Sequence, residues 1–142
     1  MALIPTTLEI LSRARADLRM GLPVLLVSGG EYALAAAAET LDAARLADLR
    51  ALGAPVLAIT SWRAETLKAR AYDGDLARVV IPSDVGIDWV AQMADPSADL
   101  HAPMKGPHRT AREGSADLHR AAIRLAKSAR LLPAVVVVSV PD

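Results

Sequence analysis

The sequence predicts an α/β fold, a layered sandwich with a mixed or mostly parallel sheet, as a single domain over residues 1–142. Two observations carry this prediction. Short apolar runs with the length and composition of buried strands occur at 24–27, 55–60, 77–81 and 135–138. The segments between these runs carry helical apolar spacing or residues that begin helices.

The first helix is predicted to begin at Thr6 or Thr7, whose hydroxyl can cap its first turn, and to end near Gly21. Its apolar positions, Leu8, Leu11 and Leu18, recur at roughly helical spacing. The run "VLLV" that follows at 24–27 is typical of a buried strand.

The stretch "VSGGEYAL" places paired glycines after this strand. A strand, glycines and a helix can cradle phosphate, but GxGxxG and GK[ST] are both missing, and Glu31 would oppose an anion. We therefore expect an ordinary tight turn at Gly29–Gly30. The Ala- and Leu-rich stretch after it predicts helix, with a break near Thr40, whose hydroxyl would cap a second helical segment toward Gly53.

A second strand is predicted at 55–60, followed by a helix over 62–72 that Ser61 caps. The run at 77–81 predicts a third strand, and a short helix then begins at Ser83 or Asp84 and continues through Met93. Residues 95–114 are polar and punctuated by proline and glycine, which predicts a loop of about 20 residues.

The last helix is predicted to begin after Ser115, with one apolar stripe made of Leu118, Ala122, Leu125 and Ala129. The strand at 135–138 follows it and is apolar throughout, as expected of a strand buried on both faces. Since a core strand lies within a few residues of the end of the sequence, we expect one domain of a longer polypeptide.

Composition excludes several classes of function. Sixteen basic and sixteen acidic residues give a net charge of zero, so we expect neither nucleic acid nor a membrane as partner. The sequence has no cysteine, hence no disulfide, thiolate zinc site or cysteine nucleophile. No signal peptide and no apolar run of about 20 residues is present, and we expect a cytoplasmic protein.

Isolated polar residues give no catalytic or metal-binding set. The spacing of His101, His108 and His119 does not match ligands on one helix, so solvated or hydrogen-bonded roles are expected. Asp73 and Asp75 flank a glycine and predict a turn rather than an acid–base pair.

The segment "HAPMKGPHRTAR" at 101–112 concentrates basic side chains. Lys105, His108, Arg109 and Arg112 could bind a phosphorylated sugar or nucleotide through charge-assisted hydrogen bonds. A solvated loop or a contact to another domain would use the same residues.

Four stretches, taken in order, carry a resemblance over nearly the whole chain: "ARADLRMGLPVLLV", "AAAAETLDAARLADLRALGAPVLAITSWRAETLKA", "MADPSADLHAP" and "AAIRLAKSARLLPAVVVV". Together they resemble 3,4-dihydroxy-2-butanone 4-phosphate synthase, an enzyme of riboflavin biosynthesis. The resemblance implies that family's layered fold and its habit of forming homodimers.

The chain departs from this family where the family binds magnesium. The family has a long acidic loop after its first strand, whereas "SGGEYAL" offers Glu31 as the sole carboxylate. The family histidine at the start of the last helix falls on Leu118, with His119 one position away. A hard divalent cation needs several oxygen ligands, so we expect no magnesium site, no catalytic residue and no synthase reaction.

Degenerate synthase-like domains occur in front of GTP cyclohydrolase II. The resemblance therefore implies the N-terminal part of a longer hydrolase chain, with zinc only in the cyclohydrolase domain and no cofactor in residues 1–142. Its role would be structural, dimerising or regulatory. The alternatives are a stand-alone binding module for a sugar phosphate or nucleotide, and a small enzyme with unrelated α/β chemistry.

Overall fold

The computed structural model describes residues 2–99 and 106–141. Its helices are α1 Thr7–Arg19, α2 Ala43–Leu52, α3 Ser61–Leu67, α4 Ile87–Ala94, the 3-10 helix η1 Pro96–Ala98, and α5 Asp117–Ser128. Its strands are β1 Val24–Ser28, β2 Glu31–Ala37, β3 Val56–Thr60, β4 Leu76–Val80, β5 Thr110–Ala111 and β6 Ala134–Val140.

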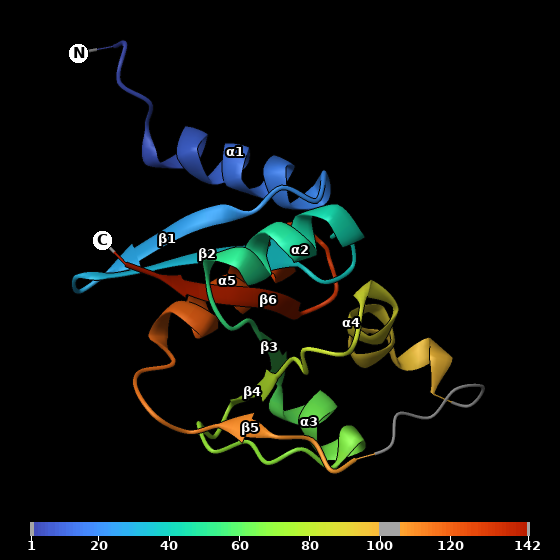
Figure 1. The fold of residues 1–142 in the computed structure, drawn as a ribbon. Coiled ribbons are helices and arrows are strands. Elements are labelled where there is room, and N and C mark those ends of the chain that lie inside the picture. The colour runs from blue at the N-terminus through green and yellow to red at the C-terminus, as the bar shows by residue number, and fades with distance from the viewer. Residues whose placement is uncertain (1, 100–105, 142) are drawn as a thin grey trace.

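The strands form one six-stranded sheet in the order β1-β2-β6-β3-β4-β5 (Figure 1). One face of the sheet packs against α2, α3 and α4, and the other packs against α1 and α5. The predicted α/β layered sandwich is therefore confirmed.

The centre of the sheet is β6, which lies between β2 and β3. Val136 and Val138 join the core under α2, while Val135 and Val137 join the core under α5. Successive side chains of a strand point to opposite faces, so an all-valine run supplies both cores at once. The prediction of a strand buried on both faces is confirmed.

The prediction of a mixed or mostly parallel sheet is wrong, because every pairing in the described sheet is antiparallel. The register of β3 and β4 shows the reason: Thr60, the last residue of β3, pairs with Leu76, the first residue of β4. The segment with α3 thus leaves and re-enters at one end of the sheet, whereas a parallel pair needs a crossover to the other end.

The Ala-rich stretch after Gly29–Gly30 forms strand β2, so the predicted helix before Thr40 is wrong. Both glycines have positive φ, +56° and +81°, and close a two-residue hairpin in which Ser28 pairs with Glu31. This confirms the tight turn. Pairing with β1 and β6 on both sides outweighs the helix propensity of alanine. Helix α2 is capped by the Asp42 side chain, not by Thr40.

Helix α1 begins as predicted. Thr6 caps it in a capping box with Glu9, each side chain hydrogen-bonded to the other residue's backbone N–H. The predicted apolar stripe is only partly buried, because Leu18 is in the core while Leu8 and Leu11 are exposed. The prediction of a buried strand at 24–27 is wrong. Strand β1 lies at the edge of the sheet, and Val24 is its only buried residue.

The remaining boundaries differ in detail. Thr60, rather than Ser61, caps α3, and that helix ends at Leu67 instead of continuing to 72. Helix α4 begins at Ile87, later than Ser83 or Asp84. The predicted loop at 95–114 contains η1 and the short strand β5, which pairs with β4. No helix in the described part of the chain is long and apolar enough to cross a membrane.

Candidate functional site

A cavity of about 420 Å³ lies beside the start of α5. It brings together the β1–β2 hairpin, the ends of β3 and β6, and the segment before α5. Its polar lining consists of Glu31, Tyr32, Arg78, Glu113, Ser115, His119 and Ser139. Glu31, the sole carboxylate of the shortened loop, and Leu118, the position on which the family histidine falls, both line this cavity.

His119 is the buried ionisable group of this cavity. It is 8% exposed, and its Nδ1 atom has no hydrogen-bond partner among the described residues. Burial, reinforced by the nearby Arg78 guanidinium and partly offset by Asp73, lowers the pKa of His119 to about 4. The imidazole is therefore neutral at pH 7 and can exchange hydrogen bonds there without carrying charge.

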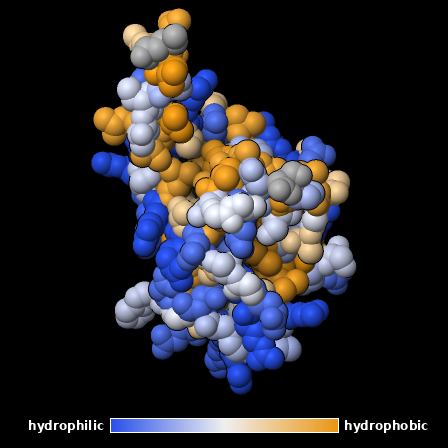
Figure 2. Space-filling model, turned by 90° about the vertical axis from the view of Figure 1, so that its left-hand side faces the viewer, coloured by the Kyte–Doolittle hydropathy of each residue, from blue (hydrophilic) through white to orange (hydrophobic). Residues whose placement is uncertain are grey.

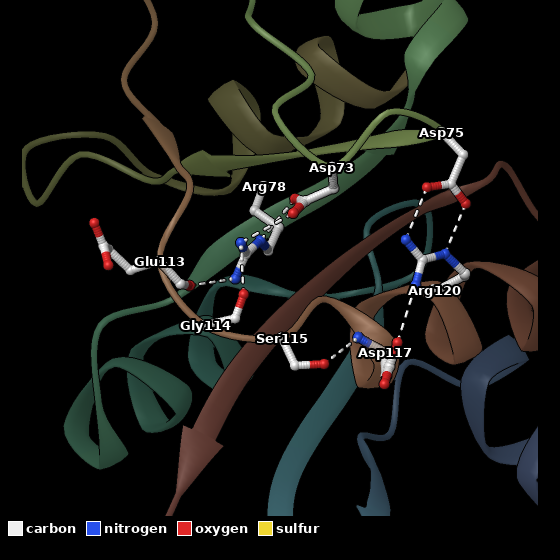
Figure 3. A network of polar contacts seen from close by, with 8 residues as sticks. All are labelled: Asp73, Asp75, Arg78, Glu113, Gly114, Ser115, Asp117 and Arg120. Atoms are coloured by element: carbon white, nitrogen blue, oxygen red, sulfur yellow. Dashed lines mark hydrogen bonds and ion pairs between the residues drawn. The ribbon is translucent and has the colours of Figure 1, made fainter.

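Arg78, 5% exposed, is fully engaged within the protein (Figure 3). Its Nε and Nη2 atoms donate to the Asp73 carboxylate at 2.9 and 3.2 Å. Its Nη1 and Nη2 atoms also donate to the carbonyl oxygens of Glu113 and Gly114, at 2.9 and 3.4 Å. The side chain thus fastens the segment before α5 to strand β4.

A second arginine fixes the first turn of α5 from outside. Arg120 donates through Nε and Nη2 to Asp75 at 2.7 and 2.9 Å, and through Nη1 to Asp117 at 3.1 Å (Figure 3). The hydrogen bond from Arg120 lowers the pKa of Asp75. The Ser115 hydroxyl accepts a hydrogen bond from the Asp117 backbone N–H at 3.1 Å. The N-cap residue of α5 is nevertheless Ala116, which has no side-chain cap, so the prediction that Ser115 caps this helix is wrong.

The sequence predicted a turn at Asp73-Gly74-Asp75, and the turn is present, with Gly74 at φ +85°. Sequence analysis missed that both carboxylates bind arginines. Arg78 is five residues from Asp73, but Arg120 is 45 residues from Asp75. No local pattern marks the second pair, because the sheet and α5 bring its partners together.

Side chains that could bind a metal ion line the cavity, but the described residues do not group them to hold one. Glu31, Glu113 and His119 contribute to its lining, yet the described residues contain no group of three or more His, Asp or Glu side chains placed to hold a metal. Magnesium usually keeps several waters and is held by one or two carboxylates, so the misfit lies in the placement of these side chains, which form no such group of three.

The predicted basic residues lie at a second cavity, of about 340 Å³, which we call the basic cleft. It is lined by Lys68, Arg70, Tyr72, Pro107, His108, Arg109 and Thr110. Of the four predicted anion-binding residues, His108 and Arg109 line it, and Arg112 lies over the Tyr72 ring at 5.5 Å. Lys105, like His101, is outside the described residues.

Sequence analysis missed Lys68, Arg70, Tyr72 and Thr110 as cleft residues. The first three follow α3 and lie about 40 positions before the predicted cluster. The pairing of β5 with β4 brings the two segments together: Thr110 pairs with Val79, and the Val80 N–H donates to the Arg109 carbonyl oxygen at 2.7 Å. Only the tertiary structure supplies this proximity.

Two polar atoms at the basic cleft are buried without partners. These are His108 Nε2 and Thr110 Oγ1, neither of which has a hydrogen bond within the described residues. Burial lowers the pKa of His108. The imidazole ring meets the edge of the Trp89 indole, with centroids 6.4 Å apart and planes at 67°.

No protein-family model and no curated protein matches the sequence. Solved structures do match the fold. A 3,4-dihydroxy-2-butanone 4-phosphate synthase in cation-free form aligns with a TM-score of 0.67 at 18% identity, over 91% of this chain and 74% of that one. The Candida albicans synthase aligns with a TM-score of 0.64 at 19% identity, over 89% and 77% of the two chains.

A third similar structure is RibBX, a two-domain 3,4-dihydroxy-2-butanone 4-phosphate synthase from A. baumannii. It aligns with a TM-score of 0.61 at 18% identity, over 93% of this chain and 48% of RibBX. At such low identity the likeness concerns the fold. The chain therefore has the fold of the 3,4-dihydroxy-2-butanone 4-phosphate synthases.

Proposed function

We propose that this synthase-like domain lacks synthase activity and supports the folding, dimerisation or regulation of a cytoplasmic GTP cyclohydrolase II in riboflavin biosynthesis. The observation that carries the proposal is the composition of the cavity beside α5. It is lined by the neutral His119 and by two carboxylates, Glu31 and Glu113, but the described residues form no group of three placed to hold a metal ion.

The arginine of this cavity also supports the proposal. Arg78 uses Nε, Nη1 and Nη2 to bind Asp73 and two backbone carbonyls. Binding a sugar phosphate would require breaking these bonds at a side chain that is almost completely buried. The arginine therefore serves the fold, which is what a domain with a structural role would require.

The decisive experiment measures formate release from ribulose 5-phosphate by the purified protein, with and without magnesium. An active 3,4-dihydroxy-2-butanone 4-phosphate synthase assayed in parallel is the positive control. We expect no release above the enzyme-free rate. Magnesium-dependent formate production would overturn the proposal of catalytic silence.

The proposed link to a cyclohydrolase is tested separately, by the size of the native polypeptide. An antibody raised against residues 1–142 should detect a band much heavier than the 14.9 kDa of this chain in an immunoblot of source cells. A band at that mass would contradict a cyclohydrolase domain in cis.

The dimerising role is supported by apolar surface at one end of the molecule. Figure 2, which views the molecule from the left-hand side of Figure 1, shows this apolar surface in its upper half. The lower half of the same view is mostly hydrophilic. Its exposed large side chains come from the N-terminal residues, α1 and β1: Leu3, Ile4, Leu8, Ile10, Leu11, Leu25 and Val27. Since β1 is an edge strand, a second copy could both pair with it and cover these side chains.

Analytical ultracentrifugation of Val27→Glu and of the control Leu52→Glu tests this homodimer. Leu52 is similarly exposed but belongs to α2 and lies outside the group of N-terminal, α1 and β1 side chains. We expect a dimer that dissociates in Val27→Glu and persists in Leu52→Glu. A monomeric parent protein would refute the proposal.

A second candidate function is that of a stand-alone module binding a sugar phosphate or nucleotide. The observation that favours it is the basic cleft, which contains two of the predicted anion-binding residues, His108 and Arg109. Calorimetric titration with ribulose 5-phosphate, GTP and flavin mononucleotide tests this function, and absence of heat with all three would count against it.

A further inference from the structure

We propose that the basic cleft is a recognition site for the phosphate group of a small phosphomonoester, held by Lys68, Arg70 and Arg109 and by hydrogen bonds to His108 and Thr110. The proposal rests on the second candidate function and gives it a site and a chemistry. The bound group is proposed to lie between the turn after α3 and the segment entering β5.

The charge of the cleft favours an anion. Lys68, Arg70 and Arg109 are exposed cations from two separate segments, and its lining contains no carboxylate. None of the three forms an ion pair among the described residues, whereas Arg63, Arg78 and Arg120 are all paired with aspartates. Three unpaired positive charges around one cavity attract an anion, most strongly at low ionic strength.

The unpaired polar atoms show where the anion would be held. Each buried polar group without a hydrogen bond destabilises a protein, and groups that lack partners call for a specific explanation. His108 Nε2 and Thr110 Oγ1 belong to two such side chains lining one cavity. A neutral imidazole with its proton on Nε2 and a threonine hydroxyl are both donors. Because both atoms are closed off from solvent in this structure, a phosphate oxygen would accept from them after the side chains around them move apart.

Both donors are held in place by the fold. Thr110 lies in β5 opposite Val79, and the His108 ring packs edge-on against Trp89. On the opposite side of the cleft, Lys68 is the C-cap of α3 in the left-handed conformation, with its N–H bonded to the Ala64 and Glu65 carbonyls. The backbone on both sides of the cleft is thus held by the fold, so binding would not have to order these segments.

The dimensions of the cleft favour a compact ligand. A volume of about 340 Å³ is near the lower end of small-molecule sites. Arg112 already lies over the Tyr72 ring at 5.5 Å, so stacking of a nucleobase on that face would displace a cation. A sugar phosphate fits these constraints better than a nucleotide does.

Isothermal titration calorimetry on the 142-residue chain at low ionic strength tests the site. The probes are inorganic phosphate, ribose 5-phosphate, adenosine monophosphate and unphosphorylated ribose. Binding of ribose 5-phosphate and inorganic phosphate is expected, ribose should give no heat, and the nucleotide should bind no better than the sugar phosphate. Nucleotide binding that is tighter by tenfold or more would overturn the preference for a sugar phosphate.

Variants locate the binding. Thr110→Val removes one donor while keeping the shape of the side chain, and Arg109→Glu reverses one charge; each should weaken ribose 5-phosphate binding roughly tenfold or more. Lys68→Glu is a further variant at an exposed position that is not in the core. The matched control is Arg13→Glu, an exposed arginine of α1 on the other side of the sheet. Circular dichroism verifies that each variant folds.

The outcomes separate the site from the function. If ribose 5-phosphate binds the parent protein but the cleft variants bind it equally well, the binding function stands and the cleft assignment is wrong. If no phosphorylated probe binds, the site assignment fails, and if ribulose 5-phosphate, GTP and flavin mononucleotide give no heat either, the second candidate function fails with it. Neither result bears on the formate assay, which tests the leading proposal independently.

Discussion

Replacing Arg78 with methionine tests how strongly the fold depends on the buried ion pair between β4 and the segment before α5. The Arg78 side chain is 6% exposed, and the Asp73 side chain that it binds is 13% exposed. Arg78→Met keeps apolar bulk but leaves the Asp73 carboxylate and the carbonyl oxygens of Glu113 and Gly114 without their donor. Removing one partner of a buried pair costs about 3–5 kcal/mol of unfolding free energy.

Arg120→Met is the matched control, because it deletes an arginine–aspartate pair of similar length at the surface. Arg120 and Asp75 have side chains 30% and 56% exposed. Exposed ion pairs contribute about 0–1 kcal/mol, since water solvates the charges when the pair breaks. The two variants should therefore differ by about 3 kcal/mol, a large part of the roughly 5–15 kcal/mol that stabilises a typical domain.

Urea unfolding at pH 7, followed by far-ultraviolet circular dichroism, measures the difference. A free energy of unfolding for Arg78→Met within about 1 kcal/mol of that for Arg120→Met would refute the argument from burial. Asp73→Asn, alone and combined with Arg78→Met, completes a double-mutant cycle. We expect the double variant to be less destabilised than the sum of the single variants, because neither charge is then left buried alone.

Three further predictions concern other parts of the chain. The pKa of His119 is about 4 in the fold against 6.5 for an ordinary histidine, so its neutral form stabilises the fold above pH 6.5 and this contribution is lost as pH falls toward 4. Between pH 7 and pH 4.5 the parent should lose about 2–3 kcal/mol more unfolding free energy than a folded His119→Gln variant; equal losses would contradict a buried neutral imidazole. Gly21→Ala should destabilise more than Gly74→Ala in thermal melts: both have positive φ, but a Cβ at Gly21 would lie 2.5 Å from the Thr40 carbonyl oxygen, and one at Gly74 meets nothing. Equal melting temperatures for the two variants would contradict this steric argument, because they would mean that the backbone near Thr40 moves to accommodate the added Cβ. Thr6→Ala should cost about 1 kcal/mol through the lost capping box, with Thr7→Ala as the neighbouring comparison; an unchanged urea midpoint for Thr6→Ala would contradict the cap.

Local sequence determined the features whose causes are local. An uninterrupted valine run predicted the central strand β6. Thr6 or Thr7 predicted the start of α1 through a side-chain cap, which Thr6 provides. The paired glycines at 29 and 30 predicted a tight turn because both require backbone angles that other residues avoid. The resemblance, carried by four collinear stretches, predicted the synthase fold that the solved structures share.

Only the tertiary structure decided the features that depend on distant pairing. The alanines of β2 form a strand because β1 and β6 bind both of its edges, which outweighs alanine's helix propensity. The sheet is antiparallel because the connection between β3 and β4 returns to the end of the sheet that it left. The alternation of helices and strands along the sequence does not specify to which end a connection returns.

The residues of the candidate sites also divide into those predicted from local sequence and those found only in the tertiary structure. His108 and Arg109 were found from a local run of basic residues, whereas Lys68 and Arg70 became part of the same cleft only through the pairing of β4 with β5. The neutrality of His119 likewise depends on burial beneath contacts from several elements. Caps, turns and apolar periodicity act over a few residues and can be read along the chain, but burial and charge neighbourhoods exist only after distant segments have packed.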